Sequence, residues 1–186
     1  MLGLKRNEVK LASHSHEWDT IATQIIQQLW NIFGSCAEDI QHFGSTAIRH
    51  IKAKPDMYIA VGVKDMNAHD DFLLRLQEID LVKIENSIES NTILCVKNSE
   101  IESGVHTLYV HILPYGCKTW NENINFRDYM NDFPQKAIAY ENLKISLAEQ
   151  FPNDRRAYKN GKIAFFKEYI SQAHVYKEFK HKLDAT

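Results

Sequence analysis

The residues in this sequence that are best suited to binding or catalysis form a turn, Gly44-Ser45-Thr46, which follows the apolar stretch at residues 40–43. The turn presents backbone N–H groups and two hydroxyls at the expected start of a short helix. Because the first N–H groups of a helix lack backbone partners and the helix dipole favours negative charge there, such a turn can hold phosphate oxygens. The same residues also make an ordinary helix cap, so the turn alone does not establish a site.

A second stretch follows shortly and adds charged groups. Lys54 and Asp56 flank Pro55, in front of an apolar run at residues 57–63. Proline disfavours helix at the residue before it, so we expect the apolar run to be a central strand. A cation and a carboxylate close to an anion-binding turn suggest metal-assisted phosphate chemistry.

The periodicity of apolar residues predicts the elements that must position these groups. Apolar residues at helical spacing predict an amphipathic helix over residues 17–33, with Gly34 as its stop. Short links predict that the last three strands pair antiparallel. The remaining elements that we expect are strands at 40–43, 57–63, 81–85, 92–97 and 105–113, and helices at 46–51, 67–79, 120–133, 135–151 and 154–182.

This order of elements is typical of the α+β class. We expect a single domain over residues 1–186, in which a mixed β-sheet is covered on one face and a helical half follows at the C-terminus. The 186 residues are enough for a sizeable core, and 44% hydrophobic with 25% charged residues is the composition of an ordinary globular protein.

Charge and cysteine content argue against several classes of protein. The formal net charge of −2 gives no strong field for nucleic acid or a membrane surface. The three cysteines, Cys36, Cys95 and Cys117, are widely spaced and contain no CxxC pair, which argues against a disulfide framework and a structural zinc site. No apolar run has the length of a membrane span, and the N-terminus lacks the apolar segment of a signal peptide. We therefore predict a cytoplasmic protein, and the sequence does not indicate its oligomeric state.

Taken in order, these residues resemble the GrpB-like family over nearly the whole chain. The turn lies in His42-Phe43-Gly44-Ser45-Thr46-Ala47, which is similar to the family's (H)xGSTA motif, and Ala53-Lys54-Pro55 is similar to its AKP motif. Further matches are Val110-His111-Ile112, the FRDY motif at Phe126-Arg127-Asp128-Tyr129, a Y-x-x-L-K element at Tyr140, Leu143 and Lys144, and a DR-x-x-Y-x-x-x-K element at Asp154, Arg155, Tyr158 and Lys162. Several ordered motifs are a more specific signal than any one of them.

The resemblance implies a nucleotidyltransferase-superfamily fold with a polymerase-β-like core, at about residues 16–115, and a helical extension at about 118–182. It also implies transfer of a nucleotidyl group. In that superfamily a Gly-Ser turn holds the triphosphate, and carboxylates on the next strand hold Mg²⁺.

The sequence departs from this pattern at the carboxylates. The expected position is Tyr58 and the possible second one is Ala60, and neither side chain can replace a ligand of a hard cation. Asp56 can share a strand face with Tyr58, but it is displaced by roughly 6–7 Å along the strand. It can therefore serve as a metal ligand only if the start of the strand is rearranged.

Two functional hypotheses follow. In the first, the protein is an active Mg²⁺-dependent enzyme that transfers a nucleotidyl group from a nucleoside triphosphate to an unknown acceptor, with Asp56 as the metal ligand and Asp56 and His111 as catalytic residues. In the second, which we favour, catalysis is weak or lost and the protein binds a nucleotide or a phosphorylated small molecule. A third possibility is different chemistry in the same cleft, with His106, His111 or Tyr58 as acid or base.

Both main hypotheses share the same anion site. Its predicted phosphate-binding residues are Gly44, Ser45, Thr46, Lys54 and Arg127.

Overall fold

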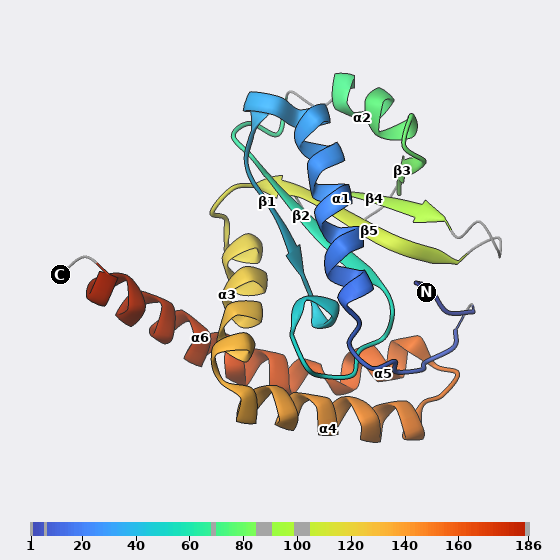
Figure 1. Cartoon of the computed structure of the whole chain (residues 1–186), viewed down its shortest axis with the longest axis vertical. Coiled ribbons are helices and arrows are strands. Elements are labelled where there is room, and N and C mark those ends of the chain that lie inside the picture. Colours follow the sequence, from blue (N-terminus) through green and yellow to red (C-terminus); the bar gives the residue numbers. More distant parts are fainter. Residues whose placement is uncertain (1, 6, 68–69, 85–90, 99–104, 185–186) are drawn as a thin grey trace.

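The computed structural model describes residues 2–5, 7–67, 70–84, 91–98 and 105–184 (Figure 1). Within these residues the chain is α+β. The helices are α1 (His16–Phe33), α2 (Asp70–Gln77), α3 (Lys118–Asp132), α4 (Pro134–Gln150), α5 (Arg155–Gly161) and α6 (Ile163–Asp184). The strands are β1 (Ala37–Phe43), β2 (Met57–Val63), β3 (Leu81–Lys83), β4 (Ile93–Asn98) and β5 (His106–Pro114).

The five strands form one mixed sheet in the order β1-β2-β5-β4-β3. As predicted, β4 pairs antiparallel with both β3 and β5. The central pair, β2 and β5, is parallel, and β1 pairs antiparallel with β2. This register sets Phe43, Tyr58 and Tyr109 beside one another across three strands.

One face of the sheet is covered by α1, which crosses it lengthwise (Figure 1). The apolar stripe that predicted this helix is buried against the sheet, with Trp18, Leu29 and Phe33 in the same core cluster as Ile59 and Val110. The Ser15 side chain caps the helix by accepting a hydrogen bond from the Glu17 amide, and the helix ends at Gly34. The core therefore lies mainly between α1 and the central strands.

The opposite face is covered in part by α3. Trp120 and Ile124 of this helix pack with Phe43, Ala60 and Leu113 of the sheet. The approach is close at Gly62, where a Cβ would lie 2.8 Å from Tyr115 and 2.9 Å from Trp120. The other helices of the C-terminal half, α4 and α6, lie together beyond the end of the sheet, and α6 continues past α3 away from the body (Figure 1).

Two predicted helices differ in the structure. The helix expected at 46–51 is only a three-residue 3₁₀ turn, Ser45–Ala47. His50 has a φ of 64°, a left-handed conformation that a helix cannot contain.

The helix expected at 154–182 is broken into α5 and α6. The break lets Tyr158 pack with Val9 and Leu147 while Tyr169 joins a different cluster with Tyr129. The first residues of the predicted helix at 67–79 and the end of the predicted strand at 81–85 fall partly outside the described residues.

Candidate functional site

The predicted Gly-Ser-Thr turn leaves β1 in a conformation that requires glycine. Gly44 has a φ of 78°, and a Cβ at this position would lie 3.3 Å from the Tyr58 ring. Ser45 is partly exposed. Thr46 is fully buried, and its hydroxyl lies 3.0 Å from Nε2 of His42 and donates to the Asp56 carbonyl at 3.3 Å. The Thr46 side chain thus connects the turn to the start of β2 and is not accessible to a ligand.

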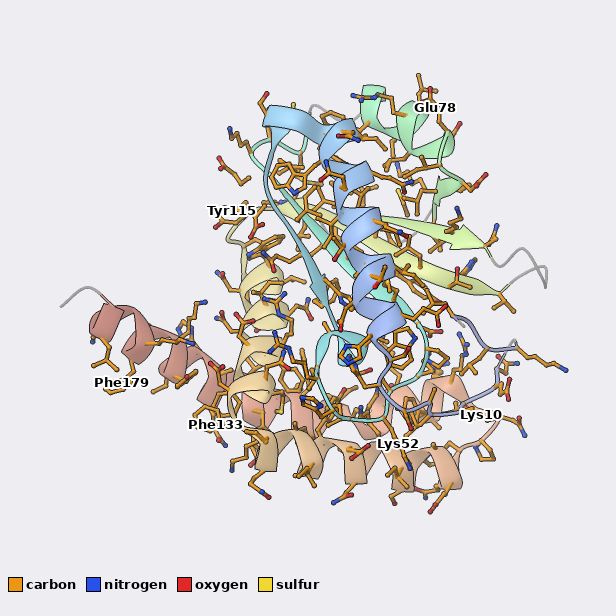
Figure 2. All side chains as sticks on the ribbon, in the orientation of Figure 1. Lys10, Lys52, Glu78, Tyr115, Phe133 and Phe179 are labelled. Carbon is orange, nitrogen blue, oxygen red and sulfur yellow. The ribbon has the colours of Figure 1, made fainter. Side chains whose placement is uncertain are left out.

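The segment after the turn is held by α3 and α4. Asn131 of α3 accepts a hydrogen bond from the Arg49 amide at 2.9 Å and donates one to the Ala47 carbonyl at 3.0 Å. At Lys52, Glu141 of α4 accepts from the amide at 2.6 Å, while Lys144 donates to the carbonyl. Figure 2 labels Lys52 at the place where the loop faces α4. Because both peptide groups of Lys52 are bonded, the position of Lys54 two residues later is fixed.

Lys144 is itself unusual because its side chain is fully buried. Burial, and secondarily the charge of Lys162, lower the pKa of Lys144 from 10.5 to about 7. Its ammonium group lies 4.7 Å from the centre of the Tyr140 ring, a cation–π contact that offsets part of the desolvation cost.

Asp56 is the buried carboxylate of the site, with 1% of its side chain exposed. Its Oδ2 lies 2.5 Å from Nζ of Lys54 and 3.8 Å from Nη1 of Arg155. Within the described residues, Oδ1 of Asp56 and Nη2 of Arg155 are buried without a hydrogen-bond partner. A buried group of this kind costs free energy until a partner is supplied. The sequence analysis placed Lys54 and Asp56 in the same candidate site, as a phosphate-binding residue and a metal ligand, and it did not identify Arg155.

The N-terminal segment closes one side of this carboxylate. The Gly3 amide donates to the Pro55 carbonyl at 2.7 Å, and Ala12 and Ala53 form an antiparallel bridge. Arg155 Nε donates to the Glu8 carbonyl at 3.2 Å. The buried state of Asp56 therefore depends on contacts between segments that are far apart in the sequence.

Two more lysines complete a cluster of positive charge. Burial, together with the charges of Lys54 and Lys159, lowers the pKa of Lys162 to about 8. Burial also lowers the pKa of Lys54, an effect that Asp56 opposes and that Arg155 and Lys159 add to. We call these four cations, Lys54, Arg155, Lys159 and Lys162, together with Asp56, the Asp56 cluster.

The functional candidates missed by the motif reasoning are Arg155, Lys159, Lys162 and Lys144. Lys144, Arg155 and Lys162 lay in the family elements Y-x-x-L-K and DR-x-x-Y-x-x-x-K, but none of them was assigned to the anion site. The spacing of these basic residues within the two elements was the signal that could have identified them. Both elements place a basic residue four positions after a tyrosine, and residues four apart lie on the same face of a helix.

Tyr58 stands at the position expected for a metal-binding carboxylate. Its ring stacks on Tyr109 with centroids 4.8 Å apart and planes at 11°. Burial and the charge of Asp56 raise its pKa above the ordinary value of 10.0, so the phenol stays protonated.

His111 lies on the same face of the sheet as Tyr58, with its ring 5.4 Å from Phe43. Burial lowers the pKa of His111 to about 4, an effect to which Lys159 adds, so this imidazole is neutral at pH 7. His106 lies on the same strand and contacts Asn98 at 2.8 Å.

Arg127 lies apart from this cluster. Its guanidinium donates to the His42 carbonyl at 2.7 Å, to Gln41 Oε1 at 2.8 Å, and to Asp128 Oδ1 at 2.6 and 2.8 Å. These bonds tie α3 to β1. The structure thus brings Lys54 and Asp56 together and places Arg127 at the edge of the sheet, where it donates four hydrogen bonds.

The residues around Asp56 do not fit a magnesium ion. Mg²⁺ prefers several oxygen ligands in octahedral geometry. Within the described residues, no group of three His, Cys, Asp or Glu side chains is placed to hold a metal. The single carboxylate here contacts two cations, which would repel a divalent ion. The role of Asp56 as a metal ligand stays a prediction that the charge of the site argues against.

The fold and this site define an α+β protein with a mixed sheet and a cluster of cations around one buried carboxylate. Comparison with known proteins gives the family: the chain belongs to the GrpB family, whose model, described as "GrpB protein", matches residues 8–172. The chain is 36% identical over 151 residues to the glutamate-rich protein GrpB of Alkalihalophilus pseudofirmus, covering 81% of this chain and 87% of that protein. The resemblance to GrpB found in the sequence is thereby confirmed.

More distant relatives agree with this assignment. A UPF0157 protein of Streptomyces coelicolor is 25% identical over 146 residues, covering 77% of this chain and 72% of that one. The crystal structure of the conserved protein GrpB from Enterococcus faecalis matches with a TM-score of 0.80 at 24% identity, over 88% of this chain and 96% of the other. This structural likeness shows the shared fold. Within the described residues, no helix combines the length and apolar character needed to cross a bilayer.

Proposed function

We propose that this GrpB-family protein binds a nucleotide or another phosphorylated small molecule through the Asp56 cluster, without a divalent metal. The observation that carries the proposal is the charge of the cluster. Lys54 and Arg155 contact a single carboxylate, and repulsion from neighbouring cations, Lys159 among them, contributes to the lowered pKa values of Lys54 and Lys162. A multiply charged anion relieves this repulsion, because each cation then gains an opposite charge.

We also infer that the fold is a variant of the nucleotidyltransferase core. The mixed sheet, with a Gly-Ser turn between two antiparallel strands and a parallel neighbour beyond, supports this assignment. Catalysis by the superfamily's chemistry requires carboxylates on β2, whereas this chain has Tyr58 and Ala60 there. Binding without nucleotidyl transfer is therefore the better supported function, and the active Mg²⁺-dependent nucleotidyltransferase is the alternative.

Calorimetric titration with inorganic triphosphate tests the proposal, once in EDTA and once with Mg²⁺. We expect binding in EDTA that weakens as salt is added, because the contacts are between charged groups. Lys159 is exposed, so Lys159→Ala leaves the fold intact and removes one cation. We expect it to weaken binding about three- to tenfold, the range of one charge-assisted contact near a surface.

Lys83→Ala is the matched control, since Lys83 is an equally exposed lysine on β3, at the far edge of the sheet. Triphosphate binding that occurs only with Mg²⁺ and is lost on Asp56→Asn substitution would instead support the enzyme. Absence of binding under both conditions would refute both functions.

A further inference from the structure

A cleft lies next to the Asp56 cluster, between the start of α3 and the helices α5 and α6. Its volume is about 560 Å³, within the range of small-molecule sites. Four lysines line it, against one carboxylate: Lys118, Lys159, Lys162 and Lys167 with Glu122. We call it the α3–α6 cleft.

The cleft is also lined by apolar side chains. Ile163, Phe166 and Ile170 line it, all from the first turns of α6. Ile163 is 44% exposed, and it lines this cleft. Phe166 packs against Phe126 with ring centroids 4.7 Å apart, so this wall is anchored to the core of the helical half.

The cleft and the Asp56 cluster share two residues. Lys159 and Lys162 line the cleft, and both act electrostatically on Lys54 or on one another within the cluster. Ile163 directly follows Lys162 in the sequence. A phosphate held by these two lysines is therefore next to the apolar residues that line the same cleft.

Charge is not balanced evenly along the cleft. Lys118 lies 3.7 Å from Glu122 and is opposed by it, so the excess of positive charge is carried by the other three lysines of the cleft, Lys159, Lys162 and Lys167. The cleft thus combines an excess of positive charge with apolar side chains, which is the pattern that recognises an amphipathic ligand.

We propose that the ligand is a phosphoester with an apolar or aromatic organic part, whose phosphate lies at Lys159 and Lys162 and whose organic part packs against Ile163 and Phe166. This inference rests on the proposed function, because it assumes that the phosphate binds at the cluster. It adds that the protein recognises the organic group as well as the charge. Nucleoside phosphates and simple aromatic phosphates share this chemistry.

Calorimetric titrations with ligands of matched charge test the inference. Phenyl phosphate and ribose 5-phosphate each carry one phosphate, but only the former has an apolar ring. We expect phenyl phosphate to bind about tenfold more tightly, since it removes apolar surface from water in the cleft. The affinities of ADP and pyrophosphate give the same comparison for a nucleoside, because only ADP carries one. Tighter binding of ADP identifies a nucleoside as an accepted organic group, whereas a preference for phenyl phosphate alone identifies an aromatic phosphoester of another kind; both outcomes support the inference.

Two variants separate the cleft from the charge. Ile163→Ser is expected to weaken phenyl phosphate about fivefold and to leave inorganic triphosphate unchanged. Ile138→Ser is the control, because Ile138 on α4 is also 44% exposed and does not line the cleft. We expect it to change neither affinity.

The outcomes that overturn the inference are distinct from those that overturn the proposed function. If triphosphate binds but phenyl phosphate and ADP bind no tighter than their polar counterparts, the organic part is not recognised and only this inference fails. An equal effect of Ile163→Ser and Ile138→Ser has the same meaning. If triphosphate does not bind, the proposed function fails and this inference fails with it.

Discussion

The buried Lys144 makes the stability of the protein depend on pH in an unusual direction. Its pKa is about 7 in the folded chain against an ordinary value of 10.5, which the unfolded chain recovers. Below pH 7 both states hold the proton, and the cost of burying the charge is present in full. Between pH 7 and pH 10.5 the folded state releases the proton while the unfolded state keeps it. Unfolding then takes up a proton, so rising pH stabilises the folded state.

The size of the effect follows from the two pKa values. One pKa unit corresponds to about 1.4 kcal/mol, and integrating the titration of one group with these values gives a gain of about 2 kcal/mol in the free energy of unfolding from pH 7 to pH 9. Lys144→Met keeps most of the side-chain volume and removes the titrating group. The variant loses the hydrogen bond to the Lys52 carbonyl, which costs about 1 kcal/mol at every pH.

Urea denaturation of the wild type and Lys144→Met at pH 7, 8 and 9 measures the difference. We expect the wild type to gain about 2 kcal/mol more than the variant over this range. Lys10→Met serves as the control, because Lys10 is exposed and we expect its pH profile to match the wild type. Parallel profiles for the wild type and Lys144→Met would refute the reasoning, since they would mean that the Lys144 ammonium keeps its proton in the folded protein.

Two further predictions concern residues of the sequence motifs. Arg127→Lys removes the planar fork that binds the His42 carbonyl and Asp128, and we expect it to lower the free energy of unfolding by about 1–3 kcal/mol in urea. Calorimetry on the folded variant should give the wild-type affinity for inorganic triphosphate, and a tenfold loss would place Arg127 in the anion site after all. Thr46→Val removes the hydroxyl between His42 and Asp56 and should cost about 1–2 kcal/mol. Thr46→Ser, which keeps the hydroxyl, should cost less. Equal losses of stability in Thr46→Val and Thr46→Ser, measured by thermal and urea unfolding, would show that the methyl group contributes as much as the hydroxyl and would contradict this prediction.

The strongly patterned parts of the fold could be predicted from the sequence. The apolar run at 57–63 is β2, and the three-and-four spacing of apolar residues gave α1 to within one residue at its start. Both the apolar run of β2 and the helical spacing of α1 are patterns within a single element, so they can be recognised without knowledge of the tertiary structure. The break between α5 and α6 was missed because each side continues the helical pattern, and only tertiary packing separates them: Gly161 packs against Leu147 of α4, and the rings on either side of the break join different clusters.

The site was predictable only where its residues are neighbours in the sequence. Lys54 and Asp56, which are two residues apart, were placed in one site by their sequence, and the structure shows that they contact one another. Arg155 reaches the same carboxylate from about one hundred residues away, and no local pattern encodes that contact. Arg127 was also assigned to the anion site, and that assignment stays a prediction; in the structure its guanidinium donates to Gln41 and the His42 carbonyl and holds α3 on β1, a contact that the motif does not reveal.

The Asp56 cluster offers a physical reason why Tyr58 and Ala60 can stand where carboxylates are expected. A metal-dependent site needs several carboxylates to hold the divalent ions that neutralise a triphosphate. Lysine and arginine supply positive charge directly, so a site built from them has no use for those carboxylates, and each additional one would weaken it. Asp56 then acts as a counter-charge that lets Lys54 and Arg155 be buried close together, because unpaired cations at that depth would be desolvated at high cost. At position 58 the tyrosine ring stacks on Tyr109.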